Sequence, residues 1–475
     1  MRARSRGWTG LAPVALIALL ALVGIGCSDD NGDDGGGPGP GPREATLSGT
    51  IDEDRTLSAD TTYTVQGFVR IAPGVTLTIP AGTVLLSDPD SRGTLITRRC
   101  DSNSPSAQLR ILGTATTPVI FRPKVAEGTA RERGLAGGIE LAGCAPVNLP
   151  TGEGISEGVS EPFGGDNADD SSGEIHYLVI EFGGREIAPD NEINGLTFNG
   201  VGAGTVVDHV QSHFIADDGF EWFGGTVNAS FLVSSANDDD NFDCDNGWVG
   251  GLQFGFVIED KNLGNRGEEC DNDANGSANE PITNPNFWNI TYIGGGPGPG
   301  NGTGINNGDK NDGLYIRRNS GSQVHNAIIA NWTNVGVSID GDGSFARLAD
   351  GTLTIDNLLF FNNRFLGSPA AQAATDPIEK NINRVASGVY STDGIADAFA
   401  GSTFVFADPQ LTSVDYENPI DGTQPNPLPQ SGSPALDPAS AATPSGPGVV
   451  DGSATYLGAF GSDNWIDGWT TWDTQ

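Results

Sequence analysis

The sequence predicts an all-β chain folded as a parallel β-helix, a solenoid in which each coil stacks on the one before it. From Thr46 onward, short β-branched runs such as YTVQGFVRI, VTLTI and QLRIL alternate apolar and polar residues between Gly, Pro or Asp. No segment keeps a convincing helical period. The tripeptide GTV at 204–206 recurs at 225–227, and FE at 220–221 returns as FD at 242–243. These offsets indicate a structural repeat of about 21–22 residues.

A repeat of this length has two main interpretations. A leucine-rich repeat needs an LxxLxL pattern followed by Asn, which this chain lacks. A β-helix coil holds three short strands joined by turns, and adjacent coils lie about 4.8 Å apart. Equivalent residues then stack, so Asn289, Asn326 and Asn357, each just before an apolar run, are expected to form a ladder.

Residues 1–26 have the pattern of a lipoprotein signal peptide. Three arginines precede an apolar run at 11–23, and small residues then lead to Cys27. Cys27 is expected to carry the lipid, and residues 27–44 form a flexible Asp/Gly/Pro tether. The apolar run is shorter than the roughly 20 residues of a transmembrane helix, although an uncleaved anchor is the alternative.

The remaining chain divides into a β-helix over 45–400 and a C-terminal end with a cap over 401–475. Segments 145–173 and 294–313 are rich in Gly and interrupt the rhythm, so they are expected to be long excursions, either functional or plain surface loops. The C-terminal WIDGWTTW, with Trp465, Trp469 and Trp472, is expected to cover the open end of the solenoid.

The charge of the chain excludes one class of partner. It has 24 basic and 61 acidic residues, a net charge of −37. Such a surface repels phosphate backbones, which argues against nucleic-acid binding and suits divalent cations. Eight Trp, 21 Phe and many Val/Ile runs supply enough apolar surface for a core, which argues against disorder.

Four cysteines remain besides Cys27. An even number in an exported chain favours disulfides. Repeat folds place sequence neighbours next to each other, so Cys100–Cys144 and Cys244–Cys270 are the expected pairs. The alternative is that these residues are free, buried thiols.

Stacked coils would also bring carboxylates together. Asp217 and Asp218 recur 21 residues later as Asp238 and Asp239. Carboxylates about 5 Å apart repel, and their pKa values rise unless a cation lies between them. Calcium takes six to eight oxygen ligands, which such a ladder can supply. The expected ligands are Asp217, Asp218 and Glu221 on one coil and Asp238, Asp239, Asp240, Asp243 and Asp245 on the next.

A second calcium site is expected in the segment DNDANGSANE. Asp271, Asp273 and Asn275 match the opening of a calcium loop, D-x-[DN]-x-[DN]-G. Position 12 of the loop is Ile282, and Glu280 comes two places early, so an EF-hand is excluded. A calcium-stapled turn is expected, with a metal-free acidic turn as the alternative.

Aromatic residues crowd the same region of the sequence. They would form a sugar or protein platform if exposed and would fill the coil interior if buried. Burial is expected for most of them, and His209 and His213 are expected to be turn or ladder residues. The aromatic residues are Phe220, Trp222, Phe223, Trp248, Phe254 and Phe256.

An enzymatic function also has to be weighed. Paired carboxylates could act as acid and base in glycoside hydrolysis, and polysaccharide lyases also use β-helices. The Gly-His-Gly and Arg-x-Lys signatures of such enzymes are absent, and nothing in the sequence places Arg317, Arg318 or Lys310 at the acids. Binding is therefore preferred over catalysis, and no catalytic residue is assigned.

Several longer motifs resemble one family. They are VTLTIPAGTVLL, DDGFEWFGGTVN, DDDNFDCDNGW and DNDANGS, with SGSPALDPA and ATYLGAFGSDNWIDGWTTW near the end. Together they are similar to a family of bacterial exported lipoproteins. The resemblance implies a right-handed parallel β-helix and a location in the cell envelope, and it implies no reaction.

These inferences predict a lipid-anchored envelope protein, on the outer membrane and exposed at the surface. We expect it to be a binding or scaffolding module stabilised by calcium, with a glycan or surface protein as partner. The alternatives are a polysaccharide lyase or glycoside hydrolase, and an adhesin or matrix component without a discrete site.

Overall fold

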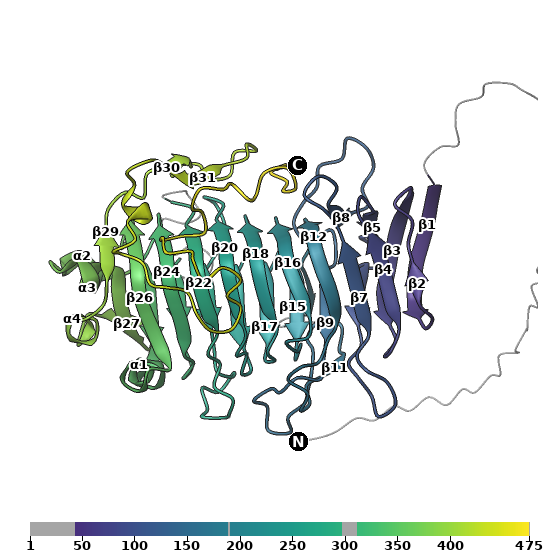
Figure 1. Cartoon of the computed structure of the whole chain (residues 1–475), viewed down its shortest axis with the longest axis horizontal. Helices are drawn as coiled ribbons and strands as arrows, with labels where there is room; N and C mark the ends of the chain where they lie inside the picture. Colours follow the sequence, from purple (N-terminus) through teal and green to yellow (C-terminus); the bar gives the residue numbers. More distant parts are fainter. Residues whose placement is uncertain (1–42, 189–190, 297–310, 475) are drawn as a thin grey trace, which may run out of the picture. The chain divides into compact units, whose positions relative to one another are not determined.

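The computed structural model describes residues 43–188, 191–296 and 311–474. Within them, one mostly parallel sheet joins 25 strands that stack side by side along a solenoid (Figure 1). The predicted parallel β-helix is therefore confirmed. The predicted signal peptide, Cys27 and the tether as far as residue 42 lie outside the described residues, as does most of the excursion at 294–313.

Strand pairing divides each coil into three faces. Seven long strands contribute their first halves to the first face and their second halves to the second, because β12, for example, pairs with β7 and then with β8. These strands are β12 (Gly173–Glu181), β16 (Val206–His213), β18 (Asn228–Ser235), β20 (Gly251–Ile258), β22 (Asn286–Ile293), β24 (Ser322–Ala330) and β26 (Leu353–Phe361). The first face also holds β2 (Arg55–Thr56), β4 (Thr76–Pro80) and β7 (Gln108–Leu112).

The second face is completed by shorter strands and by the first halves of two N-terminal strands. The shorter strands are β5 (Val84–Ser87), β8 (Val119–Pro123) and β29 (Phe404–Phe406), and the N-terminal strands are β1 (Arg43–Ile51) and β3 (Thr61–Ile71).

The third face holds the remaining coil strands and the second halves of β1 and β3. They are β6 (Thr94–Thr97), β9 (Ile139–Ala142), β15 (Leu196–Asn199), β17 (Phe220–Phe223), β19 (Phe242–Asp245), β21 (Glu268–Cys270), β23 (Leu314–Ile316), β25 (Val337–Asp340) and β27 (Ile382–Ala386).

Small elements decorate the coils. Antiparallel pairs are formed by β10 (Gly154–Ile155) with β11 (Pro162–Phe163), β13 (Arg185–Ala188) with β14 (Asn191–Ile193), β27 with β28 (Val389–Ser391), and β30 (Leu411–Ser413) with β31 (Asn426–Pro429). The helices are α1 (Gly341–Asp350), α2 (Pro369–Ala373), α3 (Pro377–Asn381), α4 (Ile395–Ala398) and a 3-10 turn at Pro434–Leu436. None of the helices in the described part of the chain has the length and apolarity needed to cross a bilayer.

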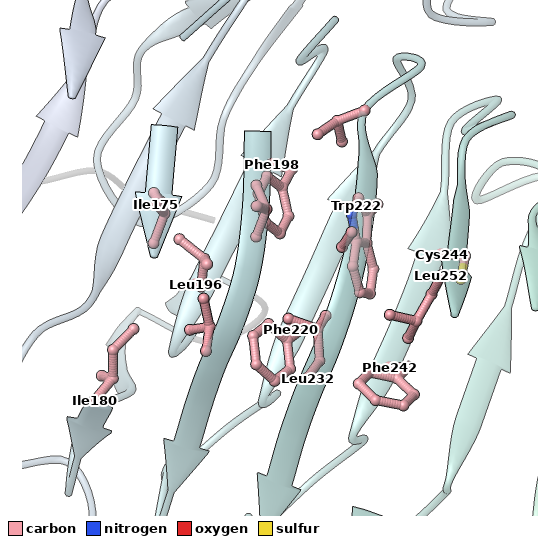
Figure 2. Close-up of a cluster of buried hydrophobic side chains, with 14 of the residues drawn as sticks. Ile175, Ile180, Leu196, Phe198, Phe220, Trp222, Leu232, Phe242, Cys244 and Leu252 are labelled. Carbon is pink, nitrogen blue, oxygen red and sulfur yellow. The ribbon is translucent and has the colours of Figure 1, made fainter. Parts of the chain in front are cut away.

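The interior of the solenoid is filled by stacked apolar side chains in register. Phe198 stacks on Trp222 with ring centroids 5.3 Å apart, and Trp222 stacks on Trp248 at 4.4 Å. Figure 2 shows a second row beside it, in which Leu196, Phe220 and Phe242 follow one another on successive coils. Burying one such side chain stabilises the fold by roughly 2–3 kcal/mol. The predicted burial of the aromatic residues is confirmed, with Phe223 half-buried as the exception.

At the bend between the first and second faces, each of the seven long strands has one residue in the left-handed conformation, and these residues stack into a second ladder. The four N-terminal rungs are Tyr177, His209, Phe231 and Phe254, with φ between 49° and 66°, and their rings stack at 4.2, 4.5 and 4.9 Å. The next three coils place asparagine at this bend, which is the predicted ladder of Asn289, Asn326 and Asn357. Their amides donate to carbonyls of the C-terminal segment.

Residues 407–474 form a C-terminal strap, which runs back along the solenoid (yellow in Figure 1). Its apolar side chains, among them Phe460 and Trp469, pack on the outer side of the second face against residues such as Val179, Val233 and Phe256. Gln211 anchors the strap by hydrogen bonds with the backbone of Thr471. The tryptophan motif therefore covers a side of the solenoid, in contrast to the end cap expected. The physical reason is that α1 already packs on β25–β27 near the C-terminal end of the solenoid. The outer side of the second face is apolar, so it is this side that the strap covers.

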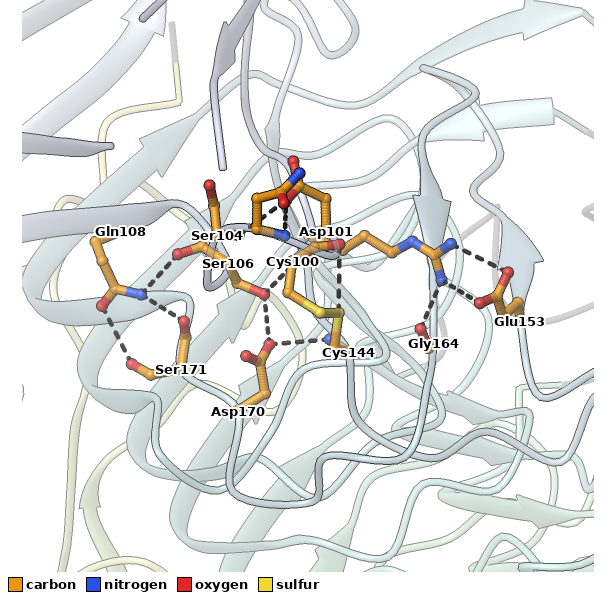
Figure 3. Close-up of a disulfide and its surroundings, with 12 residues drawn as sticks. Cys100, Asp101, Ser104, Ser106, Gln108, Cys144, Glu153, Gly164, Asp170 and Ser171 are labelled. Carbon is orange, nitrogen blue, oxygen red and sulfur yellow. Dashed lines mark hydrogen bonds and ion pairs between the residues drawn. A yellow bond between two sulfur atoms is a disulfide. The ribbon is translucent and has the colours of Figure 1, made fainter. Parts of the chain in front are cut away.

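The predicted Cys100–Cys144 disulfide is present (Figure 3). Its cysteines follow β6 and β9, on neighbouring coils of the third face. The carboxylate of Asp170 accepts hydrogen bonds from the Ser106 hydroxyl (2.7 Å) and the Cys144 amide (2.9 Å), which fixes the surrounding loops.

The predicted Cys244–Cys270 disulfide is wrong, because both residues are buried free thiols. They are register partners on β19 and β21. Stacked strands hold parallel side chains about 4.8 Å apart, whereas a disulfide brings the Cβ atoms to about 3.8 Å. The alternative of free, buried cysteines therefore holds for this pair.

Candidate functional site

The predicted acidic ladder lies on the outer side of the third face and in the turns that enter it. The segments 217–218 and 238–240 precede β17 and β19. The register pairs Glu221 with Asp243, and Asp243 with Glu269. Side chains alternate along a strand, so Phe220 and Trp222 point inward and Glu221 points outward. We call the outward column and its turns the carboxylate face, which comprises Asp217, Asp218, Glu221, Asp239, Asp240, Asp243 and Glu269.

The carboxylate face contains three overlapping groups of ligand oxygens. In each group one oxygen from each of three carboxylates lies within 4.8 Å of the others. Asp218 and Asp243 each belong to two groups, so the three form a continuous chain. Hard carboxylate oxygens without sulfur or imidazole ligands fit calcium or magnesium. The groups are Asp217–Asp218–Asp239, Asp218–Glu221–Asp243 and Asp240–Asp243–Glu269.

The protonation behaviour of these carboxylates shows a shortage of positive charge. Burial, followed by the charge of Asp239, raises the pKa of Asp217 to about 9. Burial also raises the pKa values of Asp218 and Glu221 far above the usual range, and the neighbours that add most to this are other carboxylates. A cation between these groups would replace the protons that they otherwise hold.

The third group has partial charge compensation from two arginines. Arg317 pairs with Glu269 and also with Asp271, where Nε lies 2.7 Å from a carboxylate oxygen. Arg266 is 3.7 Å from Glu269. Among the described residues, Oδ1 of Asp240 and Oδ1 of Asp243 are buried without a hydrogen-bond partner. Asp243, which the second and third groups share, therefore has an oxygen free to bind a cation. Because the arginines compensate the third group, the first two groups fit a cation best.

The excursion at 145–173 packs over the N-terminal part of the third face. Glu157 shares a hydrogen bond with Glu221, and Ser156 donates one to Glu140. Burial, with the charge of Glu192, raises the pKa of Glu157 to about 7. Glu161 forms ion pairs with Arg70 and with Arg98 (3.2 Å). The excursion is therefore a fixed flap that adds a carboxylate to the site.

Other predicted ligands lie outside the three groups. Asp238 is half-buried, and Arg133 partly offsets the burial that raises its pKa. Burial, followed by the charge of Asp271, raises the pKa of Asp245 to about 8. Asp271 is held by Arg317 and by Arg318, the latter at 2.6 Å.

The predicted calcium loop has protein partners for its side chains. The Asp273 carboxylate accepts hydrogen bonds from the amides of Asn275 (2.8 Å) and Ser277 (3.2 Å). Glu280 accepts from the Ile282 amide at 3.3 Å. These bonds are those of an acidic turn, and the metal at this loop stays a prediction.

Two site residues were missed by the sequence reasoning. Glu269 lies one coil beyond Asp243, after a longer connection that hides the repeat, and only the strand register brings it into line. Glu157 reaches the site from the excursion, whose packing has no local sequence signal. The position of Arg317 beside the acids also follows from the register, because it comes directly after β23, the strand that pairs with β21.

The stacked coils and the acidic outer face define a protein of the parallel β-helix class. The chain belongs to the family described as the pectate-lyase-like β-helix domain, whose model matches residues 49–398. The comparisons with curated proteins and with solved structures gave no significant match.

Proposed function

We propose that the chain is a calcium-binding module that holds polysaccharide at the cell envelope. One observation carries the proposal: Asp218 is 6 % exposed and belongs to two of the carboxylate groups. The neighbouring charges that affect the pKa of Asp218 most are all those of other carboxylates. Membership of a pectate-lyase-like family supports a polysaccharide as the partner. The predicted lipid at Cys27 would supply the attachment to the outer membrane.

Calcium can connect this site to a polysaccharide. Three carboxylates that each offer one oxygen supply three of the six to eight oxygens that calcium takes, so positions remain for oxygens of a ligand. Asp239 is exposed, and it places the group with Asp217 and Asp218 at the molecular surface. An ion held there is within reach of the hydroxyl or carboxylate oxygens of a sugar chain.

Catalysis is the second candidate, and the structure supplies a specific reason to consider it. A pKa of about 9 keeps Asp217 protonated at neutral pH, as a general acid in glycoside hydrolysis requires. A lyase would instead need a base. Burial lowers the pKa of Arg317, but the charges of Glu269 and Asp271 outweigh it and raise the pKa above the usual value, so Arg317 stays cationic and serves as a counter-ion.

The test uses the fragment 43–475 and calcium alone, by titration calorimetry and thermal melting. We expect a dissociation constant of ~1–100 µM and a rise in melting temperature. The variant Asp218→Asn/Asp243→Asn should bind at least tenfold more weakly. The variant Asp52→Asn/Glu53→Gln, which removes two exposed acids far from the site, should bind as the wild type. Equal binding by both variants, or none by the wild type, would refute the calcium site.

Polysaccharide binding is then measured by co-sedimentation with polygalacturonate, with calcium and with chelator. Retention that needs calcium supports the proposal. Release of reducing or unsaturated ends in the same tubes would move the assignment to an enzyme, and a loss of this product in Asp217→Asn would identify the acid.

A further inference from the structure

A cavity of about 430 Å³ lies between the strap and the aromatic rungs of the bend, away from the carboxylate face. Phe231 and Phe254 line it from the solenoid, and Tyr456 and Trp465 line it from the strap. Such a volume is in the range of small-molecule sites. Asp451 and Asp463, both exposed, lie at its rim and leave it open to solvent.

The aromatic rungs are an unusual choice for this bend. Phe231 and Phe254 have φ of 56° and 66°, a conformation that bulky side chains rarely adopt. Asn289, one coil further, has φ of 55° at the same position and tolerates it more easily. Strained residues persist where the surrounding structure or a function requires them.

The strap covers the N-terminal rungs. Trp469 contacts Tyr177 and His209 edge-on, at 5.7 and 5.8 Å, and Trp465 contacts Phe231 at 5.3 Å. At Phe254 the strap contacts the coil through its backbone, because the amides of Val450 and Asp451 donate to Oε1 of Gln253 at 2.7 and 2.8 Å, and the Phe254 side chain is buried. The half-buried rings of Phe231, Tyr456 and Trp465 therefore supply the accessible aromatic walls of the cavity.

The strap side of the cavity has a fixed shape. The Trp465 indole donates to the Ala459 carbonyl at 2.9 Å and stacks on Phe460 at 5.1 Å. A Cβ at Gly461 would lie 2.7 Å from the Tyr456 ring, so only glycine fits beside that ring. Hence the aromatic walls are in place before any ligand arrives.

The rim determines which ligand suits the cavity. Asp451 accepts hydrogen bonds from the amide and hydroxyl of Ser453, which lower its pKa and keep it ionised. Ionised carboxylates accept hydrogen bonds from hydroxyl groups and repel anions. Aromatic walls contact the C–H face of a pyranose ring. We propose that this cavity binds one ring of a neutral saccharide, without calcium and independently of the carboxylate face.

The test is calorimetry on fragment 43–475 in excess chelator, which separates this site from the calcium-dependent one. The probes are cellotriose, maltotriose and galactotriose, with trigalacturonate as the anionic comparison. We expect at least one neutral trisaccharide to bind and trigalacturonate to bind at least tenfold more weakly. Failure of all three neutral probes at millimolar concentration, or equal binding of trigalacturonate, overturns the proposal.

Variants at two rungs of the same ladder locate the site. Phe231→Asn introduces the residue that three later coils have at this bend, so it removes an aromatic wall of the cavity and keeps the backbone. Tyr177→Asn makes the same change at a rung outside the cavity. We expect at least tenfold weaker binding for Phe231→Asn and less than a twofold change for Tyr177→Asn. Equal losses in the two variants would overturn the location.

A third variant checks the rim independently of the ladder. Asp451→Asn should weaken the neutral trisaccharide several-fold and reduce the discrimination against trigalacturonate. Unchanged affinity and unchanged discrimination would show that the rim carboxylate takes no part, which contradicts the proposal.

Discussion

The position of a cysteine within a coil decides whether it can form a disulfide. Cys100 and Cys144 lie in loops after β6 and β9, where the backbone can bring their sulfurs together. Cys244 and Cys270 lie within strands, where the register holds them parallel. The sequence predicts both pairs by the same rule of neighbouring coils. It cannot separate them, because the difference depends on where each strand ends.

The first of these pairs should respond to reductant. The disulfide spans 44 residues, and the loop-entropy argument gives a stabilisation of up to about 4 kcal/mol. Dithiothreitol should therefore lower the melting temperature of the wild type, and Cys100→Ser/Cys144→Ser should match the reduced protein. The variant Cys244→Ala/Cys270→Ala should keep the full response to reductant. An unchanged melting temperature on reduction would contradict the stabilising role of this bond.

At the scale of elements, the sequence is most informative where contacts repeat from coil to coil. The repeat at 204–227 predicts that Phe220 lies over Phe242 and that the acids stack, and the register confirms both. The strap is different, because Trp469 contacts Tyr177 almost three hundred residues earlier. In the sequence, an apolar outer face appears only as strands whose residues are apolar on both sides. The same pattern is expected for strands that are buried in other ways. The existence of a cover could be predicted, and its path could not.

His213 makes the end of the strap sensitive to pH. Its Nε2 donates to the Asp473 carbonyl at 3.0 Å, and Nδ1 accepts from the Ser235 hydroxyl at 2.8 Å. Burial, opposed by the Asp473 carbonyl and aided by Arg133 and Arg131, lowers the pKa of His213 to about 4. When the strap is released, the exposed His213 side chain binds a proton near pH 6.5. Docking is therefore strongest above pH 6.5 and weakens as the pH falls towards 4.

Limited proteolysis with proteinase K checks this prediction. Cleavage within 440–475 should be several-fold faster at pH 4.5 than at pH 7.5 in the wild type. His213→Gln keeps an N–H donor for the Asp473 carbonyl without titrating, so its cleavage should lose this pH dependence. An identical pH response in both proteins would assign the effect to other groups.

For the molecule as a whole, the effect of the net charge of −37 depends on where the acidic residues lie in the fold. Composition predicts an acidic surface, and the repeat predicts that some acids stack. The extent of their burial depends on the flap at 145–173 and on neighbouring coils, which composition does not encode. Thus the sequence locates the carboxylate face, whereas only the folded chain shows that Asp218, Glu221 and Asp240 are buried in it.

This burial sets the pH dependence of the metal-free protein. The pKa values of Asp217, Asp245 and Glu157 are raised to about 9, 8 and 7, whereas in the unfolded chain they lie near 4. Between these limits the folded state binds more protons, so stability is highest at the acidic side and falls as the pH rises. In chelator, the melting temperature should therefore decrease between pH 6.5 and pH 9. Above pH 6.5 His213 is neutral in both the folded and the unfolded chain, so it does not contribute to this change.

Calcium should reverse this trend, because a bound cation neutralises the same carboxylates that protons neutralise at lower pH. The melting temperature in millimolar calcium should change little between pH 6.5 and pH 9, so the gain from calcium grows with pH. Asp217→Asn should reduce the slope in chelator, since it removes the group with the pKa of about 9. A melting temperature that stays constant or rises with pH in chelator would mean that these carboxylates are ionised without a cation, and the electrostatic basis of the metal site would fall.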